Sequence, residues 1–527
     1  MAPLLKKIQM LLKSNLTLYY CTLFLSLGSF IIIVNNNLKF PDVNDFKGLS
    51  QICLLMDDNI KYCVNTNWGF AHPLVQYLLT KVTGNLLVSQ RIISGIFVLL
   101  ALLLSKKIMK SIFPIKSKIS QLFILYFFIM TPWYISAIIS VHLDIIAVTF
   151  ILLGIVLLNT SKAISFFWVG MIVSISYWFR YHFLMYVILY PAVVYLFNFG
   201  NNRRAKTAFC GAGVFVGLLI PHILCFFSYG AISIINQKEI LMLMAGIYDS
   251  YSFEYVKRIP GILSSHLFGE VTLARLTMRF VLAFKDARVI LLMVFYAIFI
   301  REQCVELSQN AKKEKVANSN IPFRLMVLIT YSLVSVLPFV FIRGSTSRIW
   351  SALFIVSLPI CTYIVFTFKR PYYYIMMLLF VVSSLWESYS LLNRLNSKNK
   401  YFEDMSCAIE STIPLNELKV NFNKILMVAE YYNKYNKYLM FHSAVIGGWP
   451  VYFKPLIERF GRIDLYNLFE SKAYQNFNYI ILDKRIFPVS YLPVMPNGVN
   501  VLPEFTMLLE TERLMIIKIN YSLEAAQ

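Results

Sequence analysis

The sequence predicts a mainly α-helical polytopic membrane protein with a small α/β domain at its carboxyl end. Three observations predict this fold class. Of the 527 residues, 58% are hydrophobic and only 14% are charged, a composition that water-soluble globular proteins do not have. Apolar runs long enough to cross a bilayer recur up to residue 390. Beyond that point the sequence is more polar, and short strand-like runs alternate with helical pattern.

Eleven transmembrane helices are expected, because a bilayer core about 30 Å thick needs roughly 20 apolar residues per helix. The first apolar run is long enough to span and lacks a small-residue cleavage site, so we interpret it as a retained signal anchor. The expected spans are residues 15–35, 86–104, 120–136, 143–159, 164–179, 182–198, 207–228, 287–300, 325–342, 349–367 and 372–390.

Lysine and arginine gather in every second loop between these spans. Such loops mark the cytoplasmic side of a membrane protein, so they explain the net charge of +22 without a nucleic-acid partner. The amino terminus is therefore expected in the cytoplasm and the carboxyl-terminal domain outside it. A bacterial inner membrane is the preferred location, and the endoplasmic reticulum is the alternative.

Residues 1–390 form the expected transmembrane domain, and residues 391–527 form the expected extracytoplasmic α/β domain. Two long outer loops, residues 36–85 and 229–286, combine acidic residues with amphipathic stretches of helical length. Such stretches are typical of helices that lie along the membrane surface. In the second domain we expect a polar linker at residues 391–406. Three strand-forming regions follow at residues 437–448, 477–485 and 505–520, and the last of them is expected to form a hairpin.

Carboxylates are predicted at the outer face of the membrane. The first outer loop contains Asp42 and Asp45, and the short loop "SVHLD" places Asp144 at the start of a span. At such a position a carboxylate can act as a general base on a hydroxyl or an amine, or can hold a divalent cation. A loop aspartate that is merely solvated, or that caps a helix, has the same sequence pattern.

Arginines are predicted at the same level. Arg180, followed by Tyr181, and the pair Arg343 and Arg348 lie in very short outer loops, where cations are disfavoured. Each of them could extend to lipid headgroups, but three on one face favour a shared role. Arginine binds phosphate bidentately, so carboxylates and arginines together predict transfer of a sugar from a polyprenyl phosphate.

The order of these features resembles the C-type superfamily of integral-membrane glycosyltransferases, especially the branch with protein O-mannosyltransferases and lipid A aminoarabinose transferases. The resemblance covers residues 15–370. It adds two residues to the candidate site: His72 in "AHPLVQYLL", as a metal ligand or a donor to the lipid phosphate, and Arg91 in "SQRIISGIF". A histidine beside proline before a helix is also a common cap or packing residue.

The resemblance implies roles for the acidic residues and the arginines. Asp45, or else Asp42, would be the base toward the acceptor, and Asp144 would be a second acid that orients the acceptor or a metal. The arginines would clamp the donor phosphate. The chain has "VNDFKGL" and "HPL" where the family often has an acidic pair and two prolines, so the choice between Asp45 and Asp42 stays open.

Expected partners are a polyprenyl-phosphate sugar donor, membrane lipid, and a glycan, lipid or protein acceptor. A divalent cation is the one cofactor that these residues suggest, and its ligands are not assigned. Cys53 and Cys63 can form a disulfide if the first outer loop lies in an oxidising compartment.

Two other functions fit the same sequence less well. One is a transporter or flippase of a lipid-linked or small anionic substrate, but transporters usually carry internal repeats and polar groups near the bilayer midplane. The other is an O-antigen polymerase or ligase, which usually has one dominant late outer loop.

Overall fold

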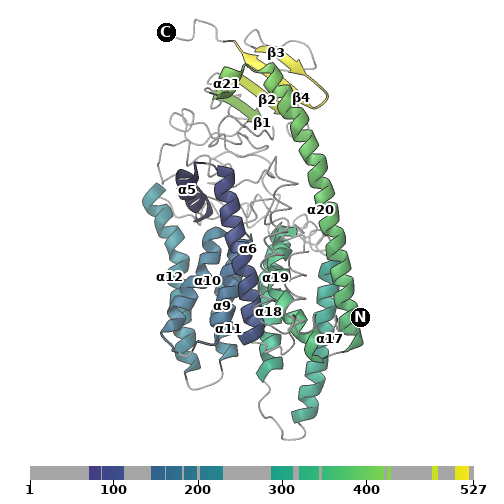
Figure 1. The fold of residues 1–527 in the computed structure, drawn as a ribbon. Helices are drawn as coiled ribbons and strands as arrows, with labels where there is room; N and C mark the ends of the chain where they lie inside the picture. Colours follow the sequence, from purple (N-terminus) through teal and green to yellow (C-terminus); the bar gives the residue numbers. More distant parts are fainter. Residues whose placement is uncertain are drawn as a thin grey trace, which may run out of the picture.

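A computed structural model gives the fold of the chain as a helical bundle joined to one small sheet (Figure 1). The structure describes residues 71–84, 86–111, 144–160, 162–180, 183–198, 202–229, 286–311, 320–343, 347–368, 370–419, 424–428, 477–484 and 505–520. Within these ranges the chain is mostly helical, as predicted.

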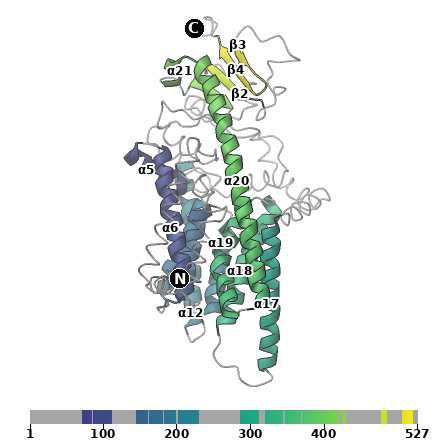
Figure 2. The same ribbon diagram turned by 45° about the vertical axis from the view of Figure 1, so that its right-hand side comes forward.

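Helices of the bundle lie side by side, α5 lies at one end, and α20 extends from the bundle to the sheet (Figures 1 and 2). The described helices are α5 (Ala71–Thr83), α6 (Leu86–Ser111), α9 (Asp144–Leu157), α10 (Ser165–Phe179), α11 (Leu184–Phe197), α12 (Arg203–Tyr229), α17 (Ala287–Ala311), α18 (Asn320–Arg343), α19 (Ser347–Phe368), α20 (Pro371–Thr412) and α21 (Leu415–Lys419).

Nine of the eleven expected spans coincide with described helices, α6, α9 to α12 and α17 to α20. The expected spans 15–35 and 120–136 lie outside the described residues. By length and composition, two segments of the described chain can cross a membrane, Arg203–Leu224 and Pro371–Asn393, and five further apolar helices are shorter. The helical class is therefore confirmed, whereas the number of eleven spans stays a prediction.

One continuous apolar core joins α6, α9 to α12 and α17 to α20. The sequence "DIIAVTFILLGIVL" of α9 is apolar on all sides, and most of its residues are buried. The outer helices bury one side and expose large apolar residues on the other, such as Phe215 on α12 and Leu378 on α20. Exposed apolar faces of this kind are typical of helices that contact lipid.

Glycines allow α10 and α12 to pack in direct backbone contact. A Cβ atom on Gly213 would lie 2.0 Å from the carbonyl oxygen of Phe167, and one on Gly170 would lie 2.3 Å from that of Cys210. Small residues spaced four apart let membrane helices approach this closely. Trp178 Nε1 also donates to the Gly217 carbonyl at 2.7 Å, so a hydrogen bond joins the carboxyl end of α10 to α12.

Figure 1 shows the helix ends at the end of the bundle away from the sheet, and basic residues lie near several of them. Lys206 Nζ donates there to the Thr160 carbonyl at 3.3 Å and to Asn198 Oδ1 at 3.1 Å. At the same end, Glu302 of α17 accepts from Tyr373 of α20 at 2.7 Å. The basic residues near these helix ends are Lys106, Lys107, Lys162, Arg203, Arg204, Lys206 and Arg370.

Helix α20 continues through residues 391–406, so the expectation of a polar linker there is wrong. The segment "LLNRLNSKNKYFEDMS" contains neither proline nor glycine, so nothing in it ends the helix. Near the end of α20, Met405, Ile409 and Ile413 pack into the core beneath the sheet. The expected boundary after residue 390 thus falls inside one helix that belongs to both parts of the chain.

The sheet has the strand order β1-β2-β4-β3. Strand β1 (Ile425–Val428) pairs in parallel with β2 (Tyr479–Asp483), and the hairpin strands β3 (Phe505–Glu510) and β4 (Leu514–Ile519) are antiparallel. The expected strand within 477–485 and the hairpin within 505–520 are confirmed. Strand β1 was not expected, because four apolar residues in a row carry no alternation, and the expected strand in 437–448 lies outside the described residues.

A matched pair of glycine substitutions tests the contact between α10 and α12. Alanine favours a helix over glycine by about 1 kcal/mol, so Gly211→Ala, whose Cβ meets nothing within 4 Å, is expected to raise the thermal unfolding midpoint slightly. Gly213→Ala forces a Cβ against a backbone carbonyl, and the overpacking should cost about 1–3 kcal/mol. The thermal unfolding midpoints of the two detergent-solubilised variants measure both effects. Equal midpoints for Gly211→Ala and Gly213→Ala would contradict the close packing of α10 against α12.

Candidate functional site

The structure brings two of the predicted site residues, Asp144 and Arg180, into a buried ion pair. Arg180 Nε lies 3.2 Å from Asp144 Oδ1, and the two side chains are 1% and 3% exposed. Burying either charge alone would carry a large desolvation penalty, which close pairing offsets in part. The sequence predicted both residues for one face, but it did not predict that they pair.

Both charges lie at helix ends where the helix dipole favours them. Asp144 is the first residue of α9, and Arg180 directly follows α10. The amino end of a helix attracts negative charge, and its carboxyl end attracts positive charge. The Arg180 backbone leaves the helix in an extended conformation, while its N–H still donates to the Ser176 carbonyl at 3.0 Å. The start of α9 lies beside the end of α10, so the Arg180 guanidinium lies beside the Asp144 carboxylate.

Three phenylalanines from α6, α9 and α10 pack together in the helical bundle near this pair. The Phe150 and Phe179 rings stack with centroids 5.9 Å apart, and Phe97 contacts them at 5.9 and 6.2 Å. Thr149 Oγ1 also lies 3.3 Å from the Phe97 carbonyl oxygen, to which it donates. These contacts fix the relative positions of the three helices, and Phe179 directly precedes Arg180 in the chain.

Arg91 lies at nearly the depth of Asp144. Arg91 precedes Phe97 by six residues on α6, and Asp144 precedes Phe150 by six residues on α9. Helices α6 and α9 run in the same direction, and the rings of Phe97 and Phe150 contact each other. Six residues correspond to roughly 9 Å along a helix, so Arg91 and Asp144 lie at about the same distance from these two rings. The guanidinium nitrogens of Arg91 are buried. Two arginines and one aspartate therefore lie at the same end of the bundle.

Helix α5 covers this end through a tight turn into α6. Gly84 adopts a positive φ of 67°, which glycine allows without strain, and its N–H donates to the Thr80 carbonyl at 2.8 Å. Thr80 Oγ1 then donates to Ser89 Oγ at 3.0 Å across the turn. His72 lies in the first turn of α5, so the expected helix of the first outer loop exists; its position along a membrane surface stays a prediction.

The remaining predicted residues are only partly placed. Arg343 is the last residue of α18, and Arg348 lies in the first turn of α19, at the same end of the bundle as Asp144. Asp42, Asp45 and Tyr181 lie outside the described residues, as do Cys53 and Cys63.

In the part of the chain that the structure describes, no group of three or more His, Cys, Asp or Glu residues is arranged to hold a metal ion. Asp42 and Asp45, the other candidate carboxylates, lie in residues 36–70 of the first outer loop, outside the described residues.

A double-mutant cycle tests the buried pair. Asp144→Asn and Arg180→Met each leave one buried charge without its partner, and each should lower the free energy of unfolding by about 3–5 kcal/mol. The double variant should lose clearly less than the sum of the two, because neither charge is then stranded. Unfolding of the four proteins in one detergent measures this coupling, and strictly additive losses would show that the charges do not pair.

Comparisons of this chain with protein-family models, with curated proteins and with solved structures found no match. The resemblance to C-type glycosyltransferases therefore depends on the order of residues in the sequence alone.

Proposed function

We propose that the protein is a glycosyltransferase that moves a sugar from a polyprenyl-phosphate donor to an acceptor at the outer face of a membrane. The observation that carries this proposal is the buried Asp144–Arg180 pair at the end of an apolar bundle, with Arg91 at nearly the same depth. The proposal needs a lipid phosphate to reach this end from the bilayer, and the exposed apolar sides of α12 and α20 support contact with lipid.

In the proposed reaction, a hydroxyl or amine of the acceptor attacks the anomeric carbon of the donor sugar. The bond from that carbon to the phosphate oxygen breaks, its electron pair stays on the phosphate, and the acceptor proton goes to a carboxylate. Asp45, or Asp42, is the proposed base. Both belong to the loop that leads directly into α5 and α6. A general base positioned in this way contributes about 10²–10⁴-fold to the rate.

The arginines are proposed to stabilise the charge that grows on the leaving phosphate. Their effect is largest in a site that excludes water, because electrostatic interactions strengthen as the local dielectric falls. Asp144 holds Arg180 in one orientation, so the guanidinium need not reorganise during the reaction. Arg91, Arg343 and Arg348 are proposed to complete the phosphate clamp, with His72 and Tyr181 as further substrate-binding residues.

The positions of the buried charges favour an enzyme over a transporter. Among the described bundle residues, Asp144, Arg180 and Arg288 are charged residues that are buried as a whole, and Arg91 buries its guanidinium nitrogens. Asp144 and Arg288 lie within the first two residues of α9 and α17, and Arg180 directly follows the end of α10. Transporters place such groups near the bilayer midplane, often where helices are broken. Charges at helix ends instead fit chemistry at the membrane surface.

The proposed function is tested by release of polyprenyl phosphate from a panel of polyprenyl-phosphate monosaccharides, with purified protein in lipid nanodiscs. Wild-type protein should release lipid phosphate from at least one donor. One of the matched variants Asp45→Asn and Asp42→Asn should lose about 100-fold or more in kcat, and the other should keep most of it. Gly211→Ala serves as the folded control.

Two further outcomes separate the chemistry from folding. Arg91→Lys keeps the charge but removes the planar guanidinium, so we expect a loss of about tenfold or more in kcat/KM with an unchanged unfolding midpoint. If wild-type protein releases lipid phosphate from none of the donors, with or without Mg²⁺ or Mn²⁺, the proposed function is wrong.

A further inference from the structure

Helices α10 and α12 both begin at the end of the bundle away from the sheet (Figure 1). Lys162 precedes α10 by three residues, and the first turn of α12 contains Arg203, Arg204 and Lys206. Lys206 brings these two parts of the chain together, because its Nζ donates to the carbonyl of Thr160, two residues before Lys162, at 3.3 Å. We call the four cations Lys162, Arg203, Arg204 and Lys206 the basic end of the bundle.

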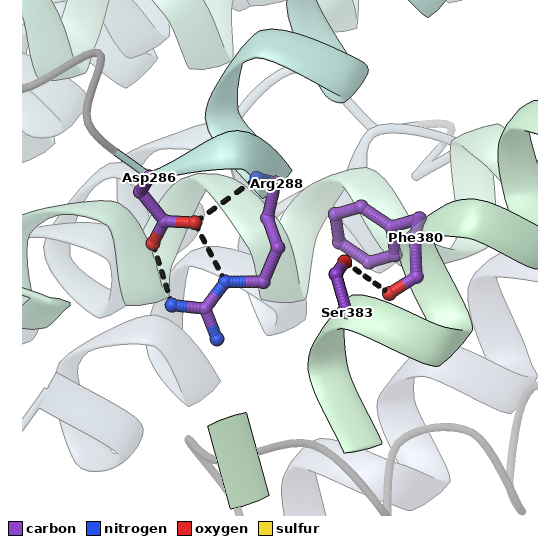
Figure 3. Close-up of polar contacts among 4 residues, drawn as sticks. All are labelled: Asp286, Arg288, Phe380 and Ser383. Atoms are coloured by element: carbon purple, nitrogen blue, oxygen red, sulfur yellow. Dashed lines mark hydrogen bonds and ion pairs between the residues drawn. The ribbon is translucent and has the colours of Figure 1, made fainter. Parts of the chain in front are cut away.

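The chain around the basic end supplies no acid to neutralise it. From residue 145 to residue 229 the sequence contains neither aspartate nor glutamate. In the described part of the chain, none of the four cations forms an ion pair with an acid. Arg288 on α17 differs, because its Nε donates to Asp286 Oδ1 at 2.7 Å (Figure 3). The basic end therefore keeps a positive charge that the described residues do not balance.

Helix dipoles account for only one of the four cations. Lys206 Nζ donates to the Thr160 carbonyl, just beyond α9, and at 3.1 Å to Oδ1 of Asn198, the C-cap residue of α11. The carboxyl end of a helix attracts positive charge, so Lys206 stabilises the ends of α9 and α11. The amino ends of α10 and α12 attract negative charge instead. Lys162, Arg203 and Arg204 lie at those amino ends, so together they favour an anion from outside the chain.

Arg203 is held in a defined orientation on the last turn of α11. Its Nη2 donates to the Tyr195 hydroxyl, and its guanidinium carbon lies 3.9 Å from the centre of the Tyr195 ring. The planar guanidinium has five N–H donors in fixed directions, which suits it to phosphate oxygens. The positive-inside rule requires only that cations be present in a loop. A stacked arginine on a helix is also preorganised, as a binding site requires.

Large apolar side chains lie exposed close to the basic end. Ile164, which directly precedes α10, is 63% exposed, and Trp168 in the first turn of α10 is 64% exposed. Lys206 Nζ lies 5.3 Å from the ring centre of Phe166, between these two residues in the sequence. Tryptophan is typical of the level at which lipid headgroups meet hydrocarbon. Helix α12 also contains one of the two described segments long and apolar enough to cross a membrane. Cations beside such a surface fit a lipid.

We propose that the basic end binds the phosphate of an anionic phospholipid through Arg203, Arg204 and Lys162, with the lipid chains beside the exposed side chains of α10. Basic sites between transmembrane helices bind anionic headgroups in this way. A zwitterionic lipid has a phosphate too, but its amine meets four cations and no acid of the described chain. The proposal rests on the bundle crossing a membrane, and it is independent of the sugar transfer proposed for the opposite end.

Native mass spectrometry of the full chain, released from detergent, measures lipid binding directly. The protein is titrated with phosphatidylglycerol and, in a matched series, with phosphatidylcholine of the same chain length. We expect phosphatidylglycerol to bind at least about tenfold more tightly. Equal affinity for the two lipids would overturn the proposal. Glycerophosphoglycerol, the headgroup without its chains, should not displace the bound lipid. Full displacement would show that a free phosphodiester is bound, and it would overturn the assignment to a lipid.

Two matched arginines locate the site. Arg204 on α12 and Arg301 on α17 are both exposed, and neither has a hydrogen bond or an ion pair within the described residues. Helices α12 and α17 lie on different sides of the bundle (Figures 1 and 2). Arg204→Gln should weaken phosphatidylglycerol binding by about fivefold, or about 1 kcal/mol, whereas Arg301→Gln should not.

The unfolding midpoint of each variant shows that it is folded, and both midpoints should equal that of the wild type. Equal weakening by Arg204→Gln and Arg301→Gln would indicate a diffuse attraction to the whole surface and would exclude the site. The double variant Arg203→Gln with Arg204→Gln should bind phosphatidylglycerol no better than the wild type binds phosphatidylcholine. Unchanged binding in that variant would exclude the site as well.

Discussion

The buried ion pair between Asp144 and Arg180 is the constraint on which the arrangement at this end of the bundle depends. Pairing offsets part of the cost of burying each charge, so it favours keeping the start of α9 beside the end of α10. The stacked phenylalanines connect α6 to the same pair of helices, and α6 carries Arg91. A site built on three such helices is preorganised, as stabilisation of a charged leaving group requires.

Two other features hold the framework around that pair. The glycine contacts bring α10 against α12 so closely that their backbones touch, which leaves α10 little freedom to shift. Helix α20 has 42 residues and is therefore about 63 Å long, roughly twice the thickness of a bilayer core. Its far end is packed into the sheet, so the carboxyl-terminal part is joined to the bundle by a continuous helix.

Sequence patterns predicted the helices and two of the strand regions, because long apolar runs and alternation are local signals. The patterns did not predict that residues 391–406, a polar segment without proline, continue α20. They also did not predict β1, because its four consecutive apolar residues do not alternate with polar ones. Within the site, charges in short loops identified Asp144 and Arg180 separately. Their pairing and the depth of Arg91 depend on how distant helices meet, which a sequence pattern does not contain.

The sidedness of the bundle decides whether the Asp144–Arg180 end can serve a reaction outside the cytoplasm, and two native cysteines can report it. Cys407 is exposed on α20 near the sheet, and Cys304 is exposed on α17 toward the opposite end. Intact cells that produce the protein would be treated with a membrane-impermeant maleimide, and both sites quantified by mass spectrometry before and after lysis. We expect Cys407 to be labelled in intact cells and Cys304 only after lysis. The reverse pattern would place the ion pair at the cytoplasmic face and contradict the proposed site.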